Sequence, residues 1–245
     1  MDQPFQSRRN RLLELLPADD FDRLRPHLDE VPLDYKFELY RAGKPIPFVY
    51  FPVTGVASIV NTMMNGAAAE VGTVGNEGIV GLPIILGDTV ASNDVYVQVP
   101  GTGLRMQSSV FREALGGSST MRKVMLHYVH ALFNQIAQSA ACNSFHTIDQ
   151  RCCRWLLMTH DRVLSDDFTL TQEFLGMMLG VGRTSITLTA SHLKGQKLIK
   201  YSRGHVTVLD RTGLEQRSCE CYAVSKREFD RLLGPPRGAA AGRHG

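Results

Sequence analysis

The stretch from residue 180 to residue 199, GVGRTSITLTASHLKGQKLI, carries residue types suited to binding a polyanion. It contains one arginine, several short hydroxylated side chains and no carboxylate. An arginine can donate two hydrogen bonds to the O6 and N7 atoms of guanine, and short side chains allow a helix to lie deep in a major groove. Carboxylates would be repelled there by the DNA phosphates. The composition therefore indicates a surface that reads duplex DNA.

The apolar residues of this stretch predict a helix over residues 183–194. Ile186, Ala190 and Leu193 recur at i, i+4 and i+7, which places them on one face that can pack against a neighbouring helix. The expected base-reading residues on the remaining surface are Arg183, Thr184, Ser185, Thr187 and Leu188. The expected phosphate contacts, which position a protein without specifying a sequence, come from Thr171, Gln172, Ser191, His192, Lys194, Lys200, Ser202 and Arg203.

The elements around this helix complete the pattern of a winged helix-turn-helix. Thr171 is a suitable N-cap for a preceding helix that runs to Leu179, and Gly180-Val181-Gly182 forms the turn between the two helices. KLIKYS and HVTVLD then alternate as two strands around the turn pair Arg203-Gly204. This order predicts a DNA-binding domain over residues 151–223. A winged helix that binds protein is the less favoured alternative.

The net charge of +3 over 245 residues conceals a difference between the two halves of the chain. Residues 1–117 contain 10 basic and 14 acidic side chains, a net charge of −4. Residues 151–217 contain 10 basic and 6 acidic side chains, a net charge of +4. Because DNA is a polyanion, the C-terminal half is the one expected to bind it.

The N-terminal part, residues 1–117, has the pattern of short helices followed by an antiparallel β-barrel or sandwich. Apolar residues between residues 8 and 30 recur at helical spacing and are interrupted by Pro17 and Pro26. After residue 31, short runs rich in Val, Ile, Tyr and Phe are divided by Gly, Pro and Asn, which predicts strands joined by turns. Asn65-Gly66 is expected to form a hairpin turn, because both residues tolerate positive φ.

A long helix with a hinge is predicted over residues 118–150, between the two parts. One apolar stripe follows the alternating three- and four-residue steps of a heptad seam and consists of Leu126, Val129, Phe133, Ile136 and Ala140. A second stripe beside it consists of Met121, Met125, Tyr128 and Leu132. Two stripes imply two partners, the helix's own β-domain and the same helix of a second subunit. The heptad stripe is therefore the predicted dimer interface, with a monomeric core helix as the alternative.

The sequence shows no catalytic or metal-binding motif, so we expect neither an enzyme nor a cofactor. A cupin-like metalloenzyme would need several histidines in the β-region, which contains only His27. The five cysteines include no C-x-x-C pair of the kind found in zinc and iron–sulfur sites. They are expected to be structural thiols and no metal is expected. A redox regulator that uses Cys152/Cys153 or Cys219/Cys221 is the alternative.

The chain has neither a signal-peptide pattern at its start nor an apolar run of the roughly 20 residues that cross a bilayer. We therefore expect a cytoplasmic protein with no membrane partner. The low-complexity segment GPPRGAAAGRHG, residues 234–245, is expected to be a flexible tail.

The order of a β-roll, a long seam helix and the segment LTQEFLGMMLGVGRTSITLTASHLKGQKLIKYSRGHVTVLD resembles the Crp/Fnr superfamily of bacterial transcription regulators. The resemblance implies an α+β fold: an antiparallel β-roll (a double-stranded β-helix, as in cyclic-nucleotide-binding domains), a long dimerisation helix and a winged helix-turn-helix. It implies a homodimer that binds two-fold-related sites on double-stranded DNA and contacts RNA polymerase. Arg183 matches the family's guanine-reading arginine. Thr184 and Leu188 depart from its usual glutamate and second arginine, so the usual operator is not expected.

The same resemblance places an effector pocket along GNEGIVGLPIILGDTVASNDVYV, with Gly75, Asn76, Glu77, Gly81, Leu82, Ser92 and Asn93 as its candidate residues. Leu82 and Pro83 stand where the family has a glutamate, and Ser92-Asn93-Asp94 replaces its phosphate-binding arginine motif. Because Asp94 would repel a cyclic phosphate, standard binding of cyclic AMP or cyclic GMP is not expected. The expected effector is therefore unidentified, or there is none.

Overall fold

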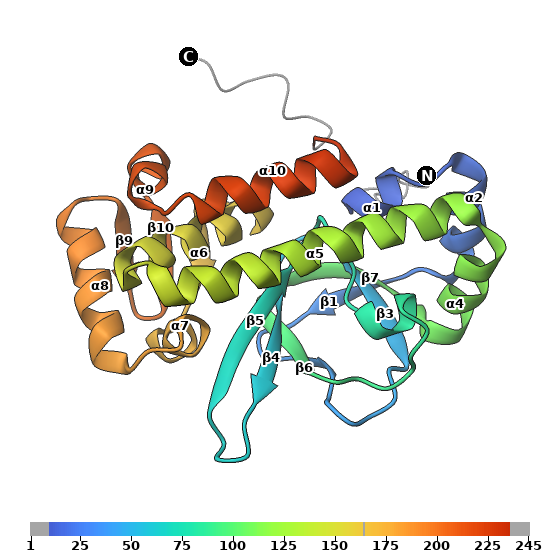
Figure 1. Cartoon of the computed structure of the whole chain (residues 1–245), viewed down its shortest axis with the longest axis horizontal. Coiled ribbons are helices and arrows are strands. Elements are labelled where there is room, and N and C mark those ends of the chain that lie inside the picture. The colour runs from blue at the N-terminus through green and yellow to red at the C-terminus, as the bar shows by residue number, and fades with distance from the viewer. Residues whose placement is uncertain (1–9, 164, 236–245) are drawn as a thin grey trace.

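The computed structural model describes residues 10–163 and 165–235 of the chain. In Figure 1 the helix α5 (Ser119–Phe145) runs along most of the molecule, with a β-roll on one side and α10 (Cys221–Leu233) on the other. The winged helix lies at one end of α5, and the N-terminal helices lie near the other end. The predicted α+β fold is confirmed. Among the helices of the described residues, none combines the length and the apolar character needed to cross a membrane.

Short helices and two antiparallel sheets form the N-terminal unit. The helices before the roll are α1 (Arg11–Glu14), α2 (Ala18–Leu24) and the 3-10 helix η1 (Arg25–His27). One sheet has the order β1-β7-β3 and the other the order β2-β6-β4-β5. The strands are β1 (Asp29–Leu33), β2 (Glu38–Tyr40), β3 (Phe48–Pro52), β4 (Val56–Thr62), β5 (Ala68–Val74), β6 (Asp94–Val99) and β7 (Gly101–Gln107). Two helices that the strand-like pattern did not predict, α3 (Leu82–Ile85) and α4 (Ser108–Gly117), complete the unit.

The hairpin predicted at Asn65-Gly66 joins β4 to β5. The Met63 amide donates to the Ala67 carbonyl at 2.7 Å, and the Asn65 side chain accepts from the Ala67 amide at 3.0 Å. Gly66 has a φ of +82°, so it supplies the left-handed residue that closes the turn. The hairpin projects from the roll beside the DNA-binding domain (Figure 1).

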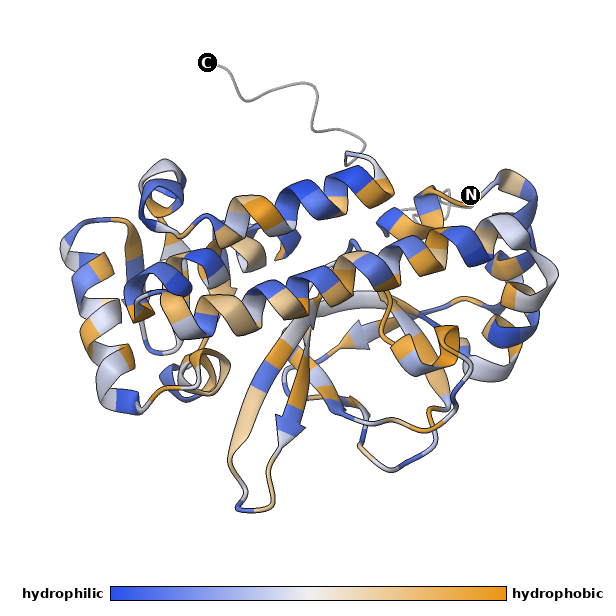
Figure 2. Ribbon diagram, in the orientation of Figure 1, coloured by the Kyte–Doolittle hydropathy of each residue, from blue (hydrophilic) through white to orange (hydrophobic). Residues whose placement is uncertain are grey.

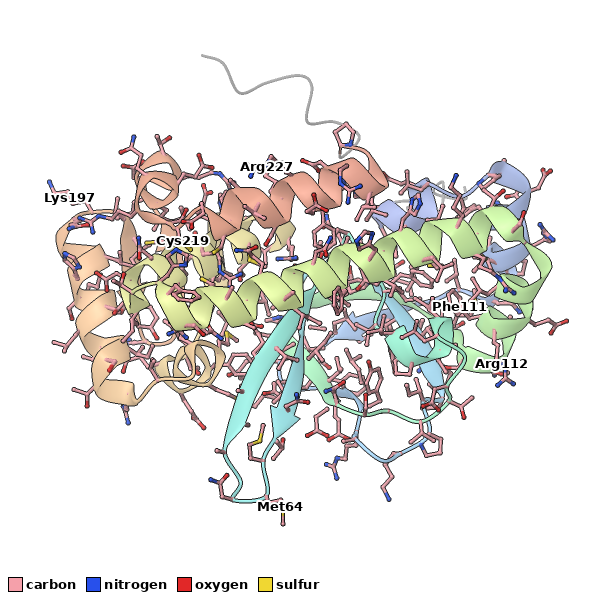
Figure 3. The ribbon with its side chains drawn as sticks, in the orientation of Figure 1. Met64, Phe111, Arg112, Lys197, Cys219 and Arg227 are labelled. Carbon is pink, nitrogen blue, oxygen red and sulfur yellow. The ribbon has the colours of Figure 1, made fainter. Side chains whose placement is uncertain are left out.

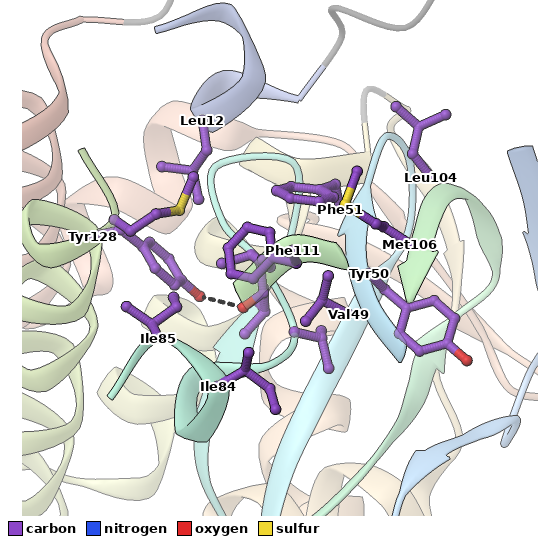
Figure 4. Packing of buried hydrophobic residues seen from close by; sticks show 14 of the residues in the cluster. Leu12, Val49, Tyr50, Phe51, Ile84, Ile85, Leu104, Met106, Phe111 and Tyr128 are labelled. Carbon is purple, nitrogen blue, oxygen red and sulfur yellow. Dashed lines mark hydrogen bonds between the residues drawn. The ribbon is translucent and has the colours of Figure 1, made fainter. Parts of the chain in front are cut away.

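Apolar side chains fill the β-roll beneath α5 (Figure 4). The rings of Phe51 and Phe111 meet edge to face with centroids 6.0 Å apart. Tyr128 of α5 is fully buried, and its hydroxyl donates to the Ile79 carbonyl at 3.1 Å. A Cβ atom at Gly78 would lie 2.5 Å from the Tyr128 ring, so this glycine permits the close contact. Tyr128 thereby fastens α5 to the roll.

The two apolar stripes of α5 have different environments, as the sequence predicted. Met121, Met125, Tyr128 and Leu132 are at most 1% exposed and form part of the core. In the heptad stripe, Leu126 and Phe133 are 46% and 66% exposed, and Ala140 is exposed. Val129 and Ile136 are half-buried against the core, and Ile136 also lies over Gly72 of β5. The heptad stripe is thus partly used within the chain and partly uncovered.

The C-terminal unit has its own core and a three-stranded wing with the order β8-β10-β9. Its elements are α6 (Ile148–Val163), β8 (Asp167–Thr169), α7 (Gln172–Leu179), α8 (Arg183–Gly195), β9 (Ile199–Ser202), β10 (His205–Val208) and α9 (Arg211–Arg217), followed by α10. SDDFTLT was expected only to end a helix. It instead contributes β8, whose Phe168 pairs with Val206 of β10.

The expected domain limits coincide with the element limits at one of three places. Residues 117 and 118 separate α4 from α5, whose N-cap is Ser118. The limit at residue 150 falls inside the first turn of α6. The limit at residue 223 falls inside α10, which continues to Leu233 and packs along α5 with its hydrophilic surface outward (Figure 2). The predicted tail lies outside the described residues from residue 236 onward.

Candidate nucleic-acid interface

The first helix of the helix-turn-helix, α7, begins and ends as its sequence requires. The Thr171 hydroxyl caps it by accepting from the Phe174 amide at 3.2 Å. Gly180 ends it with a φ of +61°, the left-handed conformation that glycine adopts without strain. The next residues turn the chain so that α8 starts at Arg183. The predicted helix-turn-helix is therefore present with the expected limits.

The apolar face of α8 is buried as predicted. Ile186 and Leu193 are fully buried and Ala190 is 4% exposed, within the core that α8 shares with α7 and the wing. Sequence reasoning missed Thr189, which is 4% exposed and donates to Asp149 of α6 at 2.9 Å. The spacing i, i+3 from Ile186 could have indicated this position. The hydrogen bond of this buried threonine connects α8 to α6.

The opposite face of α8 presents its side chains to solvent. Of the predicted base-reading residues, Arg183, Thr184, Thr187 and Leu188 are exposed, and Ser185 is half-buried. The Leu188 side chain is 68% exposed even though it is apolar. An exposed leucine on an otherwise polar helix face is suited to contact with a thymine methyl group.

A shallow groove of about 510 Å³ brings the predicted base and phosphate contacts together. It runs between α8, the start of α7 and the wing, and its lining includes Arg183, Thr187, Lys194 and Arg203. The Thr187 hydroxyl lies 3.1 Å from the Arg183 carbonyl oxygen and 3.4 Å from the Gln172 side-chain oxygen, and it donates its single proton to one of them. Six of the eight predicted phosphate contacts line the groove: Thr171, Gln172, Ser191, Lys194, Ser202 and Arg203.

The two remaining predicted phosphate contacts, Lys200 and His192, lie outside the lining of this groove. Lys200 is exposed on β9. The His192 imidazole is hydrogen-bonded through Nδ1 to Asp149 and lies 2.9 Å from the Gln196 amide through Nε2. Because Asp149 and Gln196 already engage both ring nitrogens, His192 is less available to a phosphate than its sequence position suggests.

The wing holds its basic tip in a tight turn. Arg203 and Gly204 have φ values of +50° and +80°, which are those of a two-residue hairpin turn between β9 and β10. The Tyr201 hydroxyl anchors the wing by donating to the Leu170 carbonyl at 3.1 Å. Arg203 and Ser202 are exposed at this tip, where their donors are available to a DNA backbone.

A buried ion pair joins the DNA-binding domain to the β-roll. The Arg162 guanidinium of α6 donates to the Glu77 carboxylate at 2.8 and 2.9 Å, and both side chains are at most 10% exposed. Arg162 also donates to the Met158 carbonyl at 2.8 Å and to the Gln135 side chain of α5 at 3.1 Å. Sequence reasoning missed Arg162, because its partners are distant in the chain and no motif marks it.

This ion pair changes the interpretation of three candidate effector residues. The Gly75 amide donates to Glu77 at 3.2 Å, and a Cβ at Gly75 would lie 2.5 Å from Arg162. The Asn76 carbonyl accepts from the Arg11 amide at 2.7 Å. Gly75, Asn76 and Glu77 therefore belong to the contact between the roll, α6 and the N-terminus.

The other candidate effector residues lie elsewhere in the roll. Gly81 precedes α3 and packs against Val49, and Leu82 is the first residue of α3. Ser92 and Asn93 lie in the exposed segment before β6, where Asn93 donates to Asn61. Asp94 accepts from the Ala42 amide and from the Thr62 hydroxyl, each at 3.0 Å. Both oxygens of its carboxylate are therefore hydrogen-bonded within the roll.

A second polar contact between the roll and the DNA-binding domain surrounds Glu70 of β5. Its carboxyl lies 3.2 Å from the Trp155 indole nitrogen and 2.6 Å from the Ser58 hydroxyl. Burial raises the pKa of Glu70 to about 7, although the hydrogen bonds from Ser58 and Trp155 favour its charged form. Ser58 is also hydrogen-bonded to the Gln98 carbonyl oxygen. When the Ser58 hydroxyl donates its single proton to the side-chain oxygen of Gln98, a protonated Glu70 carboxyl can donate to the Ser58 oxygen.

The cysteines fall into two groups. Cys152 and Cys153 are buried in the core of the DNA-binding domain, and burial raises the pKa of both thiols, that of Cys153 to about 12. Such thiols are protonated and poorly reactive near neutral pH. Cys142, Cys219 and Cys221 form a separate buried cluster between the end of α5 and the start of α10. His146 lies 3.5 Å from Cys221 in the same cluster.

These observations define a winged helix-turn-helix domain with an exposed second helix and a basic wing. Residues 150–217 match the Crp-like helix-turn-helix domain. No curated protein matches the sequence of the chain.

Solved structures resemble the whole fold. FixK2 from Bradyrhizobium japonicum has a TM-score of 0.65 and 15% identity, over 78% of this chain and 98% of FixK2. A transcriptional regulator of the CRP family from Thermus thermophilus has a TM-score of 0.65 and 15% identity, over 77% of this chain and 96% of its own. CLP, a c-di-GMP responsive global regulator from Xanthomonas campestris, has a TM-score of 0.62 and 13% identity, over 78% and 99%. The chain thus carries a Crp-like helix-turn-helix domain and has the fold of the Crp/Fnr family of transcription regulators.

Proposed function

We propose that this transcription regulator acts as a homodimer that reads a two-fold-related DNA site through α8. The observation that carries the proposal is the division of α8 into two faces. Ile186 and Leu193 hold the helix in the domain core, while Arg183, Thr184 and Thr187 face solvent without a carboxylate among them. Side chains of this kind can reach base edges, with Arg183 bonding the O6 and N7 atoms of guanine.

The groove beside α8 supports the same function. Phosphate-binding donors stand on both of its sides: Thr171 and Gln172 at the start of α7, and Ser202 and Arg203 on the wing. The N-terminal end of α7 adds its partial positive charge on one side, where the Glu173 carboxylate also lines the groove. Contacts on both sides of a recognition helix would fix its depth and direction in a major groove.

The exposed part of the heptad stripe supports the dimer. Phe133 and Leu126 form an uncovered apolar strip on α5, and Phe145 at the end of the helix is 85% exposed. A second copy of α5 would cover this strip, and a two-fold axis there would present two recognition helices to one duplex. Half-sites one helical turn apart require a separation of about 34 Å between these helices.

The experiment is selection of binding sites from random duplexes, followed by affinity measurements at several salt concentrations. The expected result is an inverted-repeat site whose binding weakens linearly on a log–log plot as salt rises, because phosphate contacts release counterions. Arg183→Ala should weaken binding to the selected site by about 1–3 kcal/mol. Selection of no common site, or of a site without two-fold symmetry, would contradict the proposal.

The dimer is tested separately by sedimentation of a Phe133→Asp variant. A charge in the apolar strip should shift the protein from dimer to monomer and weaken its binding to the full inverted repeat. Met64→Asp is the matched control, because Met64 is an exposed apolar residue at the tip of the β4–β5 hairpin, away from α5. Figure 3 marks this position. A dimer that survives Phe133→Asp would remove α5 from the interface.

We further propose that the protein either responds to an unidentified effector at the roll or has no effector. The interior of the roll is occupied by side chains such as Phe51, Met106 and Tyr128, and the candidate effector residues engage the protein itself. This arrangement favours control through the contacts between the roll and the DNA-binding domain over control by a ligand enclosed in the roll. Thiol oxidation at Cys152 or Cys153 is disfavoured by their burial.

A further inference from the structure

Four residues that can bind a metal ion converge where α5 ends and α10 begins. Cys142 lies in the last turn of α5, and His146 follows the last residue of that helix, where its amide donates to the Cys142 carbonyl at 3.1 Å. Cys219 and Cys221 flank the start of α10 (Figure 3 labels Cys219). The sulfur atoms and the imidazole nitrogen of the four side chains all lie within 4.8 Å of one another. The three thiols are buried, and His146 is half-buried.

Two of the distances between these atoms match those around a single tetrahedral ion. The Sγ atoms of Cys142 and Cys219 are 3.5 Å apart, and Cys221 Sγ is 3.5 Å from His146 Nδ1. Zinc binds sulfur at about 2.3 Å and imidazole nitrogen at about 2.0–2.1 Å, so the ligand atoms around it lie about 3.3–3.8 Å from one another. An iron–sulfur cluster holds its cysteines farther apart, since several atoms lie between them.

Neighbouring groups orient these ligands. The Nε2 atom of His146 lies 3.2 Å from the Glu220 carboxylate, which leaves Nδ1 directed at Cys221. A carboxylate on the second nitrogen is the usual partner of a metal-binding histidine, because it fixes the ring and its tautomer. The Gln138 amide donates to Cys221 Sγ at 3.1 Å, as amides commonly do to thiolates.

The charges around the cluster favour an ion with three thiolates. Zinc with three thiolates and a neutral imidazole has a net charge of −1. Arg151 and Arg154 of α6 are buried, and both interact electrostatically with Cys142. The Nε atoms of both guanidinium groups have no hydrogen-bond partner among the described residues. A buried anionic centre beside them would compensate their charge.

We propose that Cys142, His146, Cys219 and Cys221 form a structural Zn²⁺ site that ties α5 to the start of α10. Soft thiolate ligands in a tetrahedral arrangement select zinc over the harder divalent ions. Binding transfers three thiol protons to solvent, and no electron moves. The site fixes the connection between the long helix and the DNA-binding domain. It does not depend on which DNA sequence the protein reads.

The experiment measures zinc in the full-length protein purified under reducing conditions. The expected result is one zinc ion per chain, with X-ray absorption giving three sulfur ligands at about 2.3 Å and one nitrogen at about 2.0–2.1 Å. Cobalt in place of zinc should give the strong visible bands of a tetrahedral thiolate site. These wild-type measurements do not depend on whether a variant folds.

Single substitutions test which side chains bind the zinc ion. Cys142→Ser and Cys219→Ser should lower the zinc content from one ion per chain to near zero, whereas His146→Cys should retain the ion as a four-thiolate site. Cys152→Ser is the matched control, because Cys152 is buried in the separate core of the DNA-binding domain. Circular dichroism of each variant reports whether it folds.

Three results would overturn the zinc site. The first is reduced, folded wild-type protein in which all five thiols are free and no metal is bound stoichiometrically after zinc is supplied. The second is a Cys142–Cys219 disulfide in protein purified without oxidant. The third is a Cys152→Ser variant that loses zinc as fully as Cys142→Ser does.

Discussion

Two arginines of the DNA-binding domain, Arg183 and Arg162, have opposite surroundings. Arg183 stands exposed at the start of α8, and among the described residues its side chain forms no ion pair. Arg162 is buried in α6, where it is paired with Glu77 and bonded to Gln135 and Met158. An exposed charge is available to a ligand, whereas a buried and paired charge is committed to the fold. Arg183 is therefore available to a ligand, whereas Arg162 holds α6 against the β-roll.

The contact made by Arg162 also links three parts of the molecule. Glu77 belongs to the roll, Gln135 to α5 and Arg162 to α6 of the winged-helix domain. Arg162 is bonded to both of the other residues, so its substitution would remove the contacts that connect the three parts.

The largest expected effect is on stability and follows from removing Arg162. Arg162→Ala leaves Glu77 buried and uncompensated, which should lower the free energy of unfolding by about 3–5 kcal/mol. Denaturant unfolding followed by the fluorescence of Trp155, the single tryptophan, measures it. Arg183→Ala is the matched control and should change stability by less than about 0.5 kcal/mol. Equal losses of the free energy of unfolding in the two variants would show that Arg162 contributes no more to the stability of the fold than Arg183 does.

The next effect is a pH dependence that comes from Glu70. Its pKa in the folded protein is about 7, above the unfolded value of about 4.3. Between these values the folded state keeps a proton that the unfolded state releases, so this group makes stability fall as pH rises, and the fall ends above pH 7. The total is at most about 4 kcal/mol.

Glu70→Gln isolates this contribution, because glutamine keeps an acceptor for Trp155 but does not titrate. The stability of the variant minus that of the wild type should increase between pH 5 and pH 7. A difference that stays constant over this range would show that Glu70 is charged in the folded protein throughout.

The smallest expected effect comes from Thr171, which caps α7 and lines the protein groove beside α8. Thr171→Ala removes the cap of α7 and should lower the free energy of unfolding by about 1 kcal/mol. It should also weaken binding to all DNA sequences by a similar factor, because a phosphate contact carries no base information. Thr171→Ser retains the cap and is the control. A loss confined to one DNA sequence would assign Thr171 a base-reading role.

The sequence predicted α7, α8 and the β9–β10 hairpin because their signals are local. A cap at Thr171, glycines at the turn and apolar residues at helical spacing are each visible within a few positions. The short strand β8 has only three residues, and its pairing with β10 comes from the fold. Its sequence therefore looks like a helix stop and nothing more.

The sequence did not reveal the groups that pair over long distances. Arg162 and Glu77 are 85 residues apart, and Cys142 and Cys219 are 77 residues apart. The absence of C-x-x-C excluded a metal site only under the assumption that two ligands come from one turn with that spacing. The end of α5 instead brings Cys142 and His146 together although they are four residues apart, and this pair becomes meaningful only once α10 is placed beside α5.

The central claim is that Arg183 of α8 reads a guanine in a duplex. The direct measurement is a double-mutant cycle on the selected operator, with Arg183→Ala on the protein and 7-deazaguanine, which lacks the N7 acceptor, on the DNA. The account predicts a coupling energy of about 1–3 kcal/mol at one guanine in each half-site. A coupling energy of zero at every guanine of the operator would contradict it.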